Sequence, residues 1–237
     1  MLALRELGLE KEFWAEFAAA TLISTAASFS PFADRVLSDK EMTQLSALLA
    51  VVIDLHCRSA AQHSVVVAGI AARLAQMYGF SKKGVARIRV AGLLHDLGKL
   101  VVPAALLTKA QPLTDFERRQ IHIHPQFTWK ILSRIAGMQD IARMASFHHE
   151  RLDGKGYPFH LRGAQLDLGP RIISVADCYA ALREARCYKP AYSPEKSLII
   201  MQETAARGGL DPEVVEALRS DLMGAGQDML SASLLLP

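Results

Sequence analysis

The sequence predicts an all-α protein, a bundle of helices with an additional helical segment at its N-terminus. Apolar residues recur with the spacing of helices, and no stretch of strict alternation is long enough for a sheet. The composition is rich in Ala, Leu and Ile, with only 7% aromatic and 22% charged residues. Because 51% of the 237 residues are hydrophobic, the chain can bury a sizeable core.

The first part of the chain is predicted to contain two helices. One covers residues 10–29 and ends at Pro31, and the other begins near Ser38, a capping residue with Glu41 three positions on, and runs to Cys57. No linker rich in Gly, Pro or Ser divides the chain. We expect three segments in chain order: residues 1–58, a helical segment for dimerisation or linkage to an input domain; residues 59–222, the main domain; and residues 223–237, a tail.

Helix boundaries in the main domain follow from capping residues and helix breakers. A helix over residues 59–78 stops at Gly79, and Thr114 with Glu117 in "LTDFE" forms a capping box that opens another. Pro125 starts a helix after "HIH". The remaining predicted helices cover residues 82–97, 138–149, 169–183, 194–207 and 211–221.

Composition and charge exclude several classes of protein. The net charge is +3, from 27 basic and 24 acidic residues that are interspersed, so there is no basic stripe for a nucleic-acid polymer. Three cysteines without CxxC spacing indicate neither a disulfide framework nor a zinc ribbon, and they favour the reducing cytoplasm. The charged N-terminus is wrong for a secretory signal, and the uncharged stretch 17–33 is too short and too polar to span a membrane.

Residues that could bind a metal occur in five separate segments, each on or at the end of a predicted helix. Two of the segments, "VAGLLHDLGKLVV" and "IISVADCYAAL", are strongly apolar, and a charged Asp there is costly unless a positive charge pairs with it. A metal cluster would supply that charge. The neighbouring imidazoles of "HHERLDGKGYP" cannot share one helix face, which also favours ligation. The candidates are His63, His95, Asp96, His124, His148, His149 and Asp177.

Each candidate taken alone also has an ordinary structural interpretation. His63 shares a helix face with apolar residues and alone fits a hydrogen-bonded core histidine. Asp177 alone fits an ion pair with Arg171 or Arg183. The histidines that fit exposed loop positions are His56, His122, His124 and His160.

Taken together, these stretches resemble the HD-GYP family, a branch of the HD-superfamily metal phosphohydrolases that hydrolyse cyclic di-GMP. The resemblance covers residues 60–220 and rests on "QHSVVVAGIAARLA", "AGLLHDLGKLVVP", "LTDFERRQIHIHP", "HHERLDGKGYP" and "RIISVADCYAAL". It implies that the main domain is an HD-type helical bundle whose metal ligands project inward from several helices.

The resemblance implies two divalent metal ions, bridged by Asp96 and a metal-bound hydroxide. The ligands to one ion would be His63, His95 and Asp177, and those to the other His124, His148 and His149. Some family members bind a third ion through a Glu one turn before the first histidine, where this chain has Ser59. Imidazole and carboxylate ligands without sulfur admit iron, manganese, nickel or zinc and do not select one of them. Iron is the first expectation, with manganese, nickel and zinc as alternatives.

Substrate contacts are also implied by the resemblance. Lys99 would hold a phosphate oxygen or protonate the leaving group, and a cap on the preceding helix is the alternative. Tyr157 offers a ring and a hydroxyl to the pocket. Arg186 and Lys189 match the positions of cations that meet the second phosphate, and a solvated loop is the alternative for both.

The "DGKGYP" loop would form a lip on the pocket. Its two glycines are expected to adopt backbone conformations that other residues avoid. Its proline is expected to make the end of the loop rigid. Two carboxylates are expected to support the ligands or fix the loop. These supporting residues are Glu150, Asp153, Gly154, Gly156 and Pro158.

The expected activity is hydrolysis of a 3'-5' phosphodiester of cyclic di-GMP to linear pGpG in bacterial second-messenger signalling, with further cleavage to GMP left open. Asp96 and Lys99 would be the catalytic residues. The implied partners are cyclic di-GMP, diguanylate cyclase domains at the GYP loop, and a second copy in a homodimer.

Two departures from the family pattern keep other functions open. Residues 183–188, "REARCY", replace the usual Thr-x-Asp-Arg-Pro-Tyr, and His160 replaces a small Gly after GYP. One alternative is a catalytically weak cyclic di-GMP receptor or cyclase-interacting regulator. Another is a phosphodiesterase for a different cyclic dinucleotide.

Overall fold

The computed structural model describes residues 36–57, 62–185 and 190–224. The chain divides into two compact units, residues 1–38 and the residues from Asp39 on. Of the first unit only residues 36–38 are described, and they contain neither helix nor strand; the helix predicted over 10–29 lies outside the described residues. All regular structure in the described part of the second unit is helical, which confirms the predicted all-α class.

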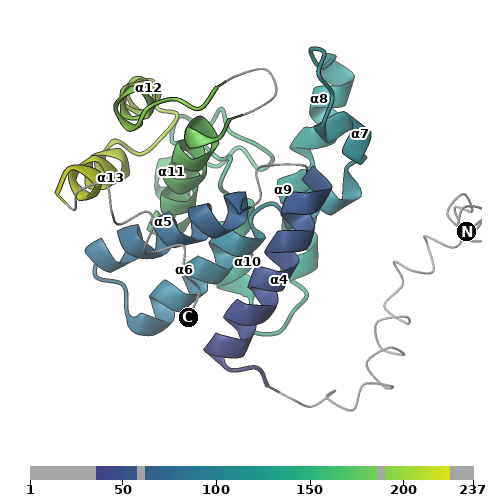
Figure 1. Ribbon diagram of the computed structural model, residues 1–237. Coiled ribbons are helices and arrows are strands. Elements are labelled where there is room, and N and C mark those ends of the chain that lie inside the picture. Colours follow the sequence, from purple (N-terminus) through teal and green to yellow (C-terminus); the bar gives the residue numbers. More distant parts are fainter. Residues whose placement is uncertain (1–35, 58–61, 186–189, 225–237) are drawn as a thin grey trace, which may run out of the picture. The chain divides into compact units, whose positions relative to one another are not determined.

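Ten α-helices and two short 3₁₀ helices make up this described part (Figure 1). In chain order they are α4 (Asp39–Cys57), α5 (His63–Met77), α6 (Lys82–Leu94), η1 (Leu97–Val101), α7 (Ala104–Leu107), α8 (Asp115–His122), α9 (His124–Leu132), α10 (Gln139–Ser146), η2 (Gly163–Gln165), α11 (Leu168–Arg183), α12 (Pro194–Ala206) and α13 (Pro212–Gly224).

Local capping explains most of the helix starts. The hydroxyl of Thr114 accepts the Glu117 N–H at 3.2 Å and the Glu117 carboxylate accepts the Thr114 N–H at 2.8 Å, so the predicted capping box is confirmed. Pro125 stands in the first turn of α9, also as predicted. Ser81 and Ser193 cap α6 and α12 through their side chains.

Two helices end earlier than the sequence predicts. α6 stops at Leu94 instead of 97, because the chain tightens into η1 where Gly98 packs on the backbone of His124. α10 stops at Ser146 instead of 149, and the Glu150 N–H then donates to the Phe147 carbonyl in a turn. Both early ends leave histidines just beyond a helix, where the backbone can aim them inward.

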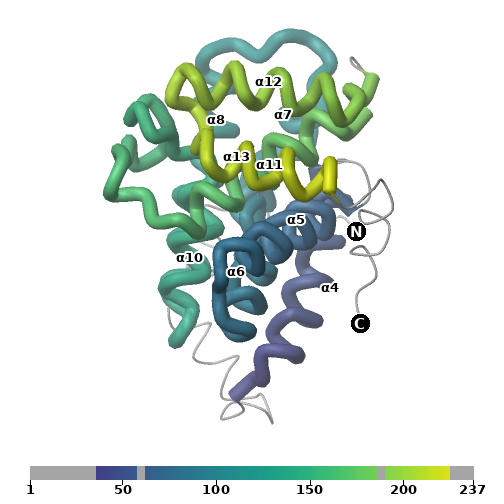
Figure 2. Tube along the Cα trace, turned by 90° about the vertical axis from the view of Figure 1, so that its left-hand side faces the viewer, coloured from purple at the N-terminus to yellow at the C-terminus, as the bar shows by residue number. Residues whose placement is uncertain are grey.

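α5 packs against α6 and α11, and α4 covers α6 and η1 (Figure 1). The α5 and α6 backbones approach closely because Gly92 faces Ala68, whose Cα lies only 2.7 Å from where a Cβ on residue 92 would stand. α13 packs on α5 and α11, and α12 packs on α11 and α13 (Figure 2). This close packing brings the first residue of α5 beside the end of α6.

α4 is an integral part of this second unit. His56, expected in an exposed loop, instead lies half-buried on α4, where its Nε2 is 2.9 Å from the Val102 carbonyl oxygen. That expectation was wrong because α4 packs on η1 and its last turn is covered on the side that carries His56. His160 is exposed, as expected. No described helix is both long enough and apolar enough to cross a bilayer.

Candidate metal centre

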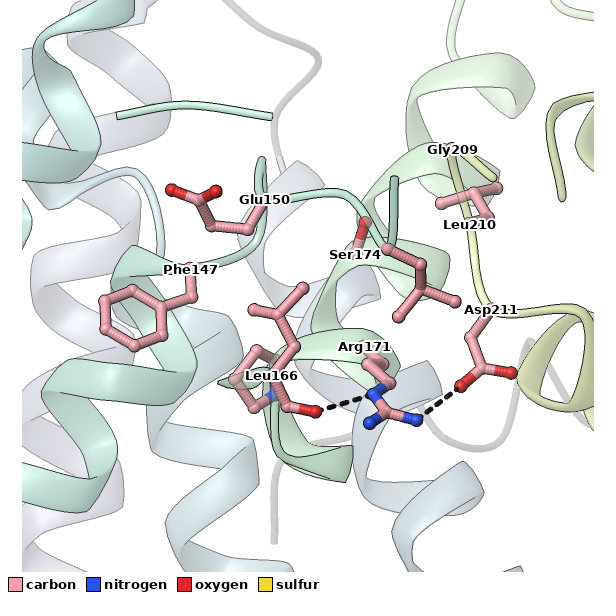
Figure 3. A pocket seen from close by; sticks show the side chains of 10 residues that line it. Phe147, Glu150, Leu166, Arg171, Ser174, Gly209, Leu210 and Asp211 are labelled. Atoms are coloured by element: carbon pink, nitrogen blue, oxygen red, sulfur yellow. Dashed lines mark hydrogen bonds and ion pairs between the residues drawn. The ribbon is translucent and has the colours of Figure 1, made fainter. Parts of the chain in front are cut away.

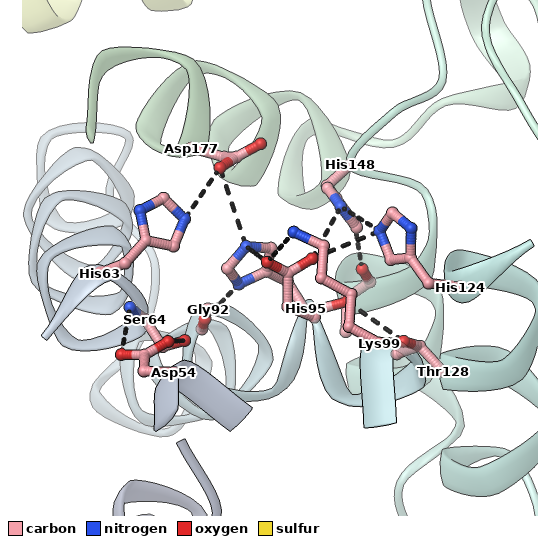
Figure 4. Close-up of polar contacts among 12 residues, drawn as sticks. Asp54, His63, Ser64, Gly92, His95, Lys99, His124, Thr128, His148 and Asp177 are labelled. Carbon is pink, nitrogen blue, oxygen red and sulfur yellow. Dashed lines mark hydrogen bonds and ion pairs between the residues drawn. The ribbon is translucent and has the colours of Figure 1, made fainter. Parts of the chain in front are cut away.

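The metal-ligand candidates come from α5, α9 and α11 and from the segments that follow α6 and α10. Figure 4 shows the side chains of His63, His95, His124, His148 and Asp177 pointing toward one another. Their nitrogen and oxygen atoms form two groups, each with all ligand atoms within 4.8 Å of one another. A third set, His95, Asp96 and His148, joins the two groups. The groups are His63, His95 and Asp177, and His124, His148 and His149.

Asp96 lies between the two groups. Its Oδ2 is 3.3 Å from Nε2 of His95, and its Oδ1 is 3.3 Å from Nε2 of His124 and 3.9 Å from Nε2 of His148. On the other side, Oδ1 of Asp177 is 3.2 Å from Nε2 of His63 and 3.7 Å from Nε2 of His95. The carboxylate of Asp96 therefore faces both groups at once, one oxygen to each.

Three of the histidines are oriented by the same backbone contact. Nδ1 of His95, His124 and His148 lies 2.8, 2.8 and 2.6 Å from the carbonyl oxygen of the residue three positions earlier. With the proton on Nδ1 donated to that carbonyl, the lone pair of each ring is on Nε2, which points into the centre. This is the tautomer and orientation that a metal-binding histidine needs.

Electrostatics favour a cation next to Asp96, His148 and His149. Burial tends to raise the pKa of Asp96, but His95, Lys99 and His124 together hold it well below its usual range. Burial, with the neighbouring His124, lowers the pKa of His149 to about 3. Burial also lowers the pKa of His148 well below its usual range. At neutral pH the carboxylate is ionised and these two imidazoles are neutral, the forms in which both residue types bind metals.

The centre contains buried polar atoms whose hydrogen bonding is incomplete. Nε2 of His95 and Oδ1 of Asp96 have no hydrogen-bond partner among the described residues, although both residues are almost fully buried. Leaving such atoms unsatisfied costs about 1–3 kcal/mol each. A divalent cation between the imidazole and carboxylate groups would satisfy them, so the residues present fit a metal.

Comparison with known proteins identifies the family of this chain. Residues 47–214 match the sequence profile of the HD domain family. The chain belongs to this family. The family predicted from the sequence is therefore confirmed, and the described helices are those of an HD domain.

Curated relatives of this HD domain are phosphodiesterases by name. 3'3'-cGAMP-specific phosphodiesterase 1 of Vibrio cholerae serotype O1 is 34% identical over 80% of this chain and 44% of its own length. The cyclic di-GMP phosphodiesterase response regulator RpfG of Xanthomonas campestris is 39% identical over 63% of this chain and 40% of its own length. The chain thus spans less than half of each relative.

Solved structures share the fold. A cyclic GMP-AMP specific phosphodiesterase of V. cholerae aligns with a TM-score of 0.60 over 83% of this chain and 54% of that one, at 15% identity. An HDG"Y"P protein of Bdellovibrio bacteriovorus aligns with a TM-score of 0.58 over 79% of this chain and 65% of that one, at 16% identity. At such identities the likeness concerns the fold alone.

The alternative interpretation of Asp177 was wrong. Within the HD domain, Arg171 pairs with Asp211 at 3.2 Å and donates to the Leu166 carbonyl, while Arg183 donates to the Tyr192 carbonyl. Asp177 meets histidines instead. His124, which alone fitted an exposed loop, is only 1% exposed.

Lys99 lies inside the centre and does not cap α6. Its Nζ is 2.5 Å from Oδ2 of Asp96, and its side chain is 24% exposed. Burial tends to lower its pKa, but Asp96 raises it above the usual value, so Lys99 carries a proton at neutral pH. Asp177, with a side chain 18% exposed, shares this partly open side of the centre.

A column of three rings leads from the loop into the centre. The rings of His122 and Tyr157 are stacked with centroids 4.0 Å apart and planes at 7°, and Tyr157 in turn lies 4.8 Å from the His149 ring at 30°. Burial raises the pKa of Tyr157, so its hydroxyl keeps its proton. His122, which alone fitted an exposed loop position, is half-buried at the end of α8. Its stacking partner lies 35 positions away in the chain, so no local pattern predicts the contact.

The GYP loop is anchored by carboxylates and by close packing. Glu150, 3% exposed, accepts the N–H groups of Phe159 and Leu161 at 2.6 and 2.9 Å, and Asp153 accepts the Lys155 N–H at 2.9 Å. Pro158 follows a cis peptide bond. Beside Glu150 lies a cavity of about 10 Å³, closed by Arg171 and Asp211, with room for no more than one water molecule (Figure 3).

The two glycines of the loop have different roles. Gly154 has a φ of +74°, a left-handed backbone conformation that residues with a side chain avoid, as expected. Gly156 does not lie in the positive-φ region, so the expectation for it was wrong. A Cβ at residue 156 would instead overlap the backbone of Glu150 and Arg151, and only glycine allows that approach.

Sequence reasoning missed two residues that support the ligands. Thr128, fully buried, accepts the Gly98 N–H at 2.9 Å and donates to the His95 carbonyl at 3.1 Å, which ties η1 to α9. Oε2 of Glu184 lies 3.5 Å from Nδ1 of His63. Neither belongs to a motif of the sequence. Arg186, Lys189 and Ser59, which carried expectations about substrate and a third metal, lie outside the described residues.

Proposed function

We propose that this HD domain is a metal-dependent phosphodiesterase that opens a 3'-5' phosphodiester of a cyclic dinucleotide, cyclic di-GMP in the first place, to give the linear dinucleotide. The observation that carries the proposal is the inward convergence of imidazole and carboxylate groups around Asp96, with buried atoms of His95 and Asp96 left without partners. A phosphohydrolase uses such a centre to bind the metal ions that polarise a phosphate.

Two divalent ions, iron first, would be held by the residues of the two groups, with Asp96 between them: His63, His95 and Asp177, and His124, His148 and His149. When bound, such ions acidify a coordinated water and offset the charge that develops on the phosphate. Manganese, nickel and zinc suit the same ligands.

The chain's own cations would handle the phosphate and the leaving group. In the reaction the water oxygen forms a bond to phosphorus and the bond from phosphorus to the 3' oxygen breaks. Lys99, protonated and next to Asp96, would hold a non-bridging oxygen and give the departing 3' oxygen its proton. Arg186 and Lys189 would meet the second phosphate, and Tyr157 would contact the substrate from the loop.

A second candidate substrate is 3'3'-cGAMP. Two of the relatives, 34% and 36% identical, are named as specific for it. Because the bond cleaved in the two dinucleotides would be of the same type, the metal centre alone does not distinguish between these two substrates. If the centre binds the dinucleotide without cleaving it, we expect a regulatory role in which a cyclase domain binds at the GYP loop.

The test is anaerobic turnover of both cyclic dinucleotides by protein loaded separately with iron, manganese, nickel and zinc. His95→Ala/Asp96→Ala is the blank, and Glu203→Ala, an exposed carboxylate on α12 outside the ligand set, is the control. Metal-dependent formation of a linear dinucleotide by the wild type and the control, and not by the blank, would support the proposal. Metal-loaded protein that binds but cleaves neither dinucleotide would overturn it in favour of a receptor.

A further inference from the structure

The start of α5 is capped by a carboxylate from another helix. Asp54 of α4, only 5% exposed, accepts the backbone N–H of Ser64 through Oδ2 at 3.2 Å and the Ser64 hydroxyl through Oδ1 at 2.7 Å. Ser64 is fully buried and directly follows His63 in the chain. Figure 4 shows the pair next to His63, whose ring reaches toward Asp177. A buried carboxylate of α4 thus meets the residue beside a metal-ligand candidate.

The residue that precedes α5 does not provide this cap. Gln62 has a left-handed backbone conformation with a φ of 100°, and its side chain makes no capping hydrogen bond. The first N–H groups of an α-helix have no carbonyl partner within the helix. A carboxylate near them accepts a hydrogen bond and interacts favourably with the positive end of the helix dipole. Asp54 therefore does for α5 what Thr114 does for α8, although Asp54 stands ten positions before Ser64 and on a different helix.

His63 is oriented in a different way from His95, His124 and His148. In those three residues the ring Nδ1 contacts a carbonyl three positions earlier, whereas Nδ1 of His63 faces the carboxylate of Glu184 at 3.5 Å. His63 is also the first residue of its helix, and helices fray at their ends. Contacts with distant segments therefore matter more for the position of His63 than for the other three.

The hydrogen bond from Ser64 to Asp54 acts on His63 through the peptide group. The N–H of Ser64 belongs to the planar unit that joins Ser64 to His63. A hydrogen bond that fixes this plane also fixes the direction in which the His63 side chain leaves the backbone. The groups of a binding site must be held within about 0.5 Å of their productive positions. Loss of the cap would loosen the ring that meets Asp177 at 3.2 Å.

The helix that carries Asp54 is anchored on both sides of this residue. Ile53 is fully buried in the domain core, and Nε2 of His56 lies 2.9 Å from the Val102 carbonyl oxygen, just after η1. Burial raises the pKa of the Cys57 thiol to about 12 against the opposing effect of the Lys99 ammonium, so the last turn of α4 runs beside the centre. The carboxylate therefore stands on a rigid support, as a group that orients a ligand must.

We propose that Asp54 is a positioning residue for the first metal group, His63, His95 and Asp177. By capping α5 it sets the affinity of this group for its ion without touching the ion. The inference rests on the metal binding proposed above and not on the identity of the dinucleotide. The second group takes its ligands from α9 and from the segment after α10, and two of them are anchored to carbonyls three residues earlier. Loss of Asp54 is therefore expected to affect one ion and not the other.

The first experiment is titration of the metal-free full chain with Co²⁺, followed by calorimetry and by the absorption bands of the bound ion. The wild type is expected to bind two ions, one in each group. Asp54→Ala is expected to weaken one of the two binding steps by about 10- to 100-fold, as is typical when a ligand loses the group that orients it, and to leave the other unchanged. Asp54→Asn should restore the weakened step, because its amide oxygen can accept the Ser64 N–H while its NH₂ group donates to the Ser64 hydroxyl.

Asp211→Ala is the matched control. Asp211 is a buried carboxylate, 7% exposed, that caps another helix by accepting the N–H groups of Glu213 and Val214 at 2.9 and 3.4 Å at the start of α13. Its loss is expected to lower the Tm, as the loss of Asp54 does, while both Co²⁺ affinities keep their wild-type values. The comparison separates a role at the metal from the general cost of removing a buried cap.

A second measurement needs no metal. In the metal-free protein the amide hydrogen of Ser64 should exchange faster in Asp54→Ala than in the wild type, whereas the amides at the start of α9 should not change. Ser64→Ala removes only the hydroxyl and keeps the backbone hydrogen bond, so it is expected to fold even where Asp54→Ala does not. It should weaken the same Co²⁺ binding step by a smaller factor.

The outcomes separate this inference from the proposed activity. Wild-type Co²⁺ affinities in Asp54→Ala would overturn the role of Asp54 and leave the metal centre intact. Equal weakening of both binding steps in Asp54→Ala and in Asp211→Ala would also overturn it, since the effect would then be general destabilisation. A wild type that binds no Co²⁺ would refute the metal centre and this inference together, whereas metal binding without hydrolysis would count only against the proposed activity.

Discussion

Nδ1 of His63 lies 3.5 Å from Oε2 of Glu184, on the edge of the ring opposite the Nε2 that meets Asp177 at 3.2 Å. Burial tends to lower the pKa of His63, but Asp177 and Glu184 raise it to about 10, so a metal ion that binds His63 displaces a proton from it. A carboxylate behind a ligating histidine fixes the ring and increases its basicity. We therefore expect Glu184→Ala to weaken metal affinity by about 10- to 100-fold, and Glu184→Gln to weaken it less.

Competition between the protein and a chelator of known affinity measures this effect. Glu203→Ala on α12, an exposed carboxylate, is the control and is expected to change nothing. The absorption bands of the Co²⁺-loaded protein should also shift in Glu184→Ala, because the orientation of His63 changes. Unchanged affinity together with unchanged bands would mean that Glu184 has no role at the centre.

Removal of metal should lower thermal stability. Ligand at 100 times its dissociation constant stabilises the native state by about 2.7 kcal/mol, and for a domain of this size that corresponds to a rise in Tm of roughly 5–10 °C. Calorimetry with and without chelator checks this. His95→Ala/Asp96→Ala should show the same Tm in both conditions, and a metal-dependent rise in that variant would place the stabilising site elsewhere.

Replacement of Lys99 should separate chemistry from metal binding. Lys99→Ala removes the protonated amine next to Asp96, and we expect kcat to fall by about 10²- to 10⁴-fold while the metal content stays unchanged. Lys99→Arg should not restore the rate, because a guanidinium does not give up its proton. A fall in metal content parallel to the fall in kcat would instead make Lys99 a support for Asp96.

The stack of His122 on Tyr157 should matter for substrate binding. A stacked pair contributes about 0.5–1.5 kcal/mol, so His122→Ala is expected to raise KM by roughly 2- to 10-fold with a smaller effect on kcat. His122→Phe, which keeps a flat ring, should restore KM, and Glu203→Ala on α12 is the control. Equal values of KM in His122→Ala and wild type would show that the stack does not position Tyr157.

How much of the fold could be predicted from the sequence depends on how local the sequence pattern for each feature is. Capping residues such as Thr114 and Pro125 act within one turn, and these helix starts were predicted correctly. The early end of α6 depends on Gly98 meeting His124, a tertiary contact without a local signal. Glu184 and Thr128 were missed for a similar reason, since a single buried polar residue forms no pattern until its partner is known.

The metal ligands could be predicted by another route than the helix boundaries. Long gapped strings such as "HHERLDGKGYP" identify the family, and residues far apart in the chain then follow from the resemblance. The structure adds the physical reason that they can act together. The ends of α6 and α10 and the start of α9 each leave a histidine whose Nδ1 bonds to a carbonyl three residues before it.

The last prediction concerns pH and the capping box of α8. Lys109 at 2.7 Å and the Thr114 N–H at 2.8 Å lower the pKa of Glu117 from 4.5 to about 2. Because the folded pKa lies below the unfolded one, Glu117 stabilises the fold fully above about pH 4.5, and the contribution disappears as the pH falls toward 2. The Tm of Glu117→Gln should therefore lie below that of the wild type at pH 7 and coincide with it near pH 2. Glu203→Gln should match the wild type at both pH values, and a difference between Glu117→Gln and wild type that persists at pH 2 would assign the effect to the shape of the side chain and not to its charge.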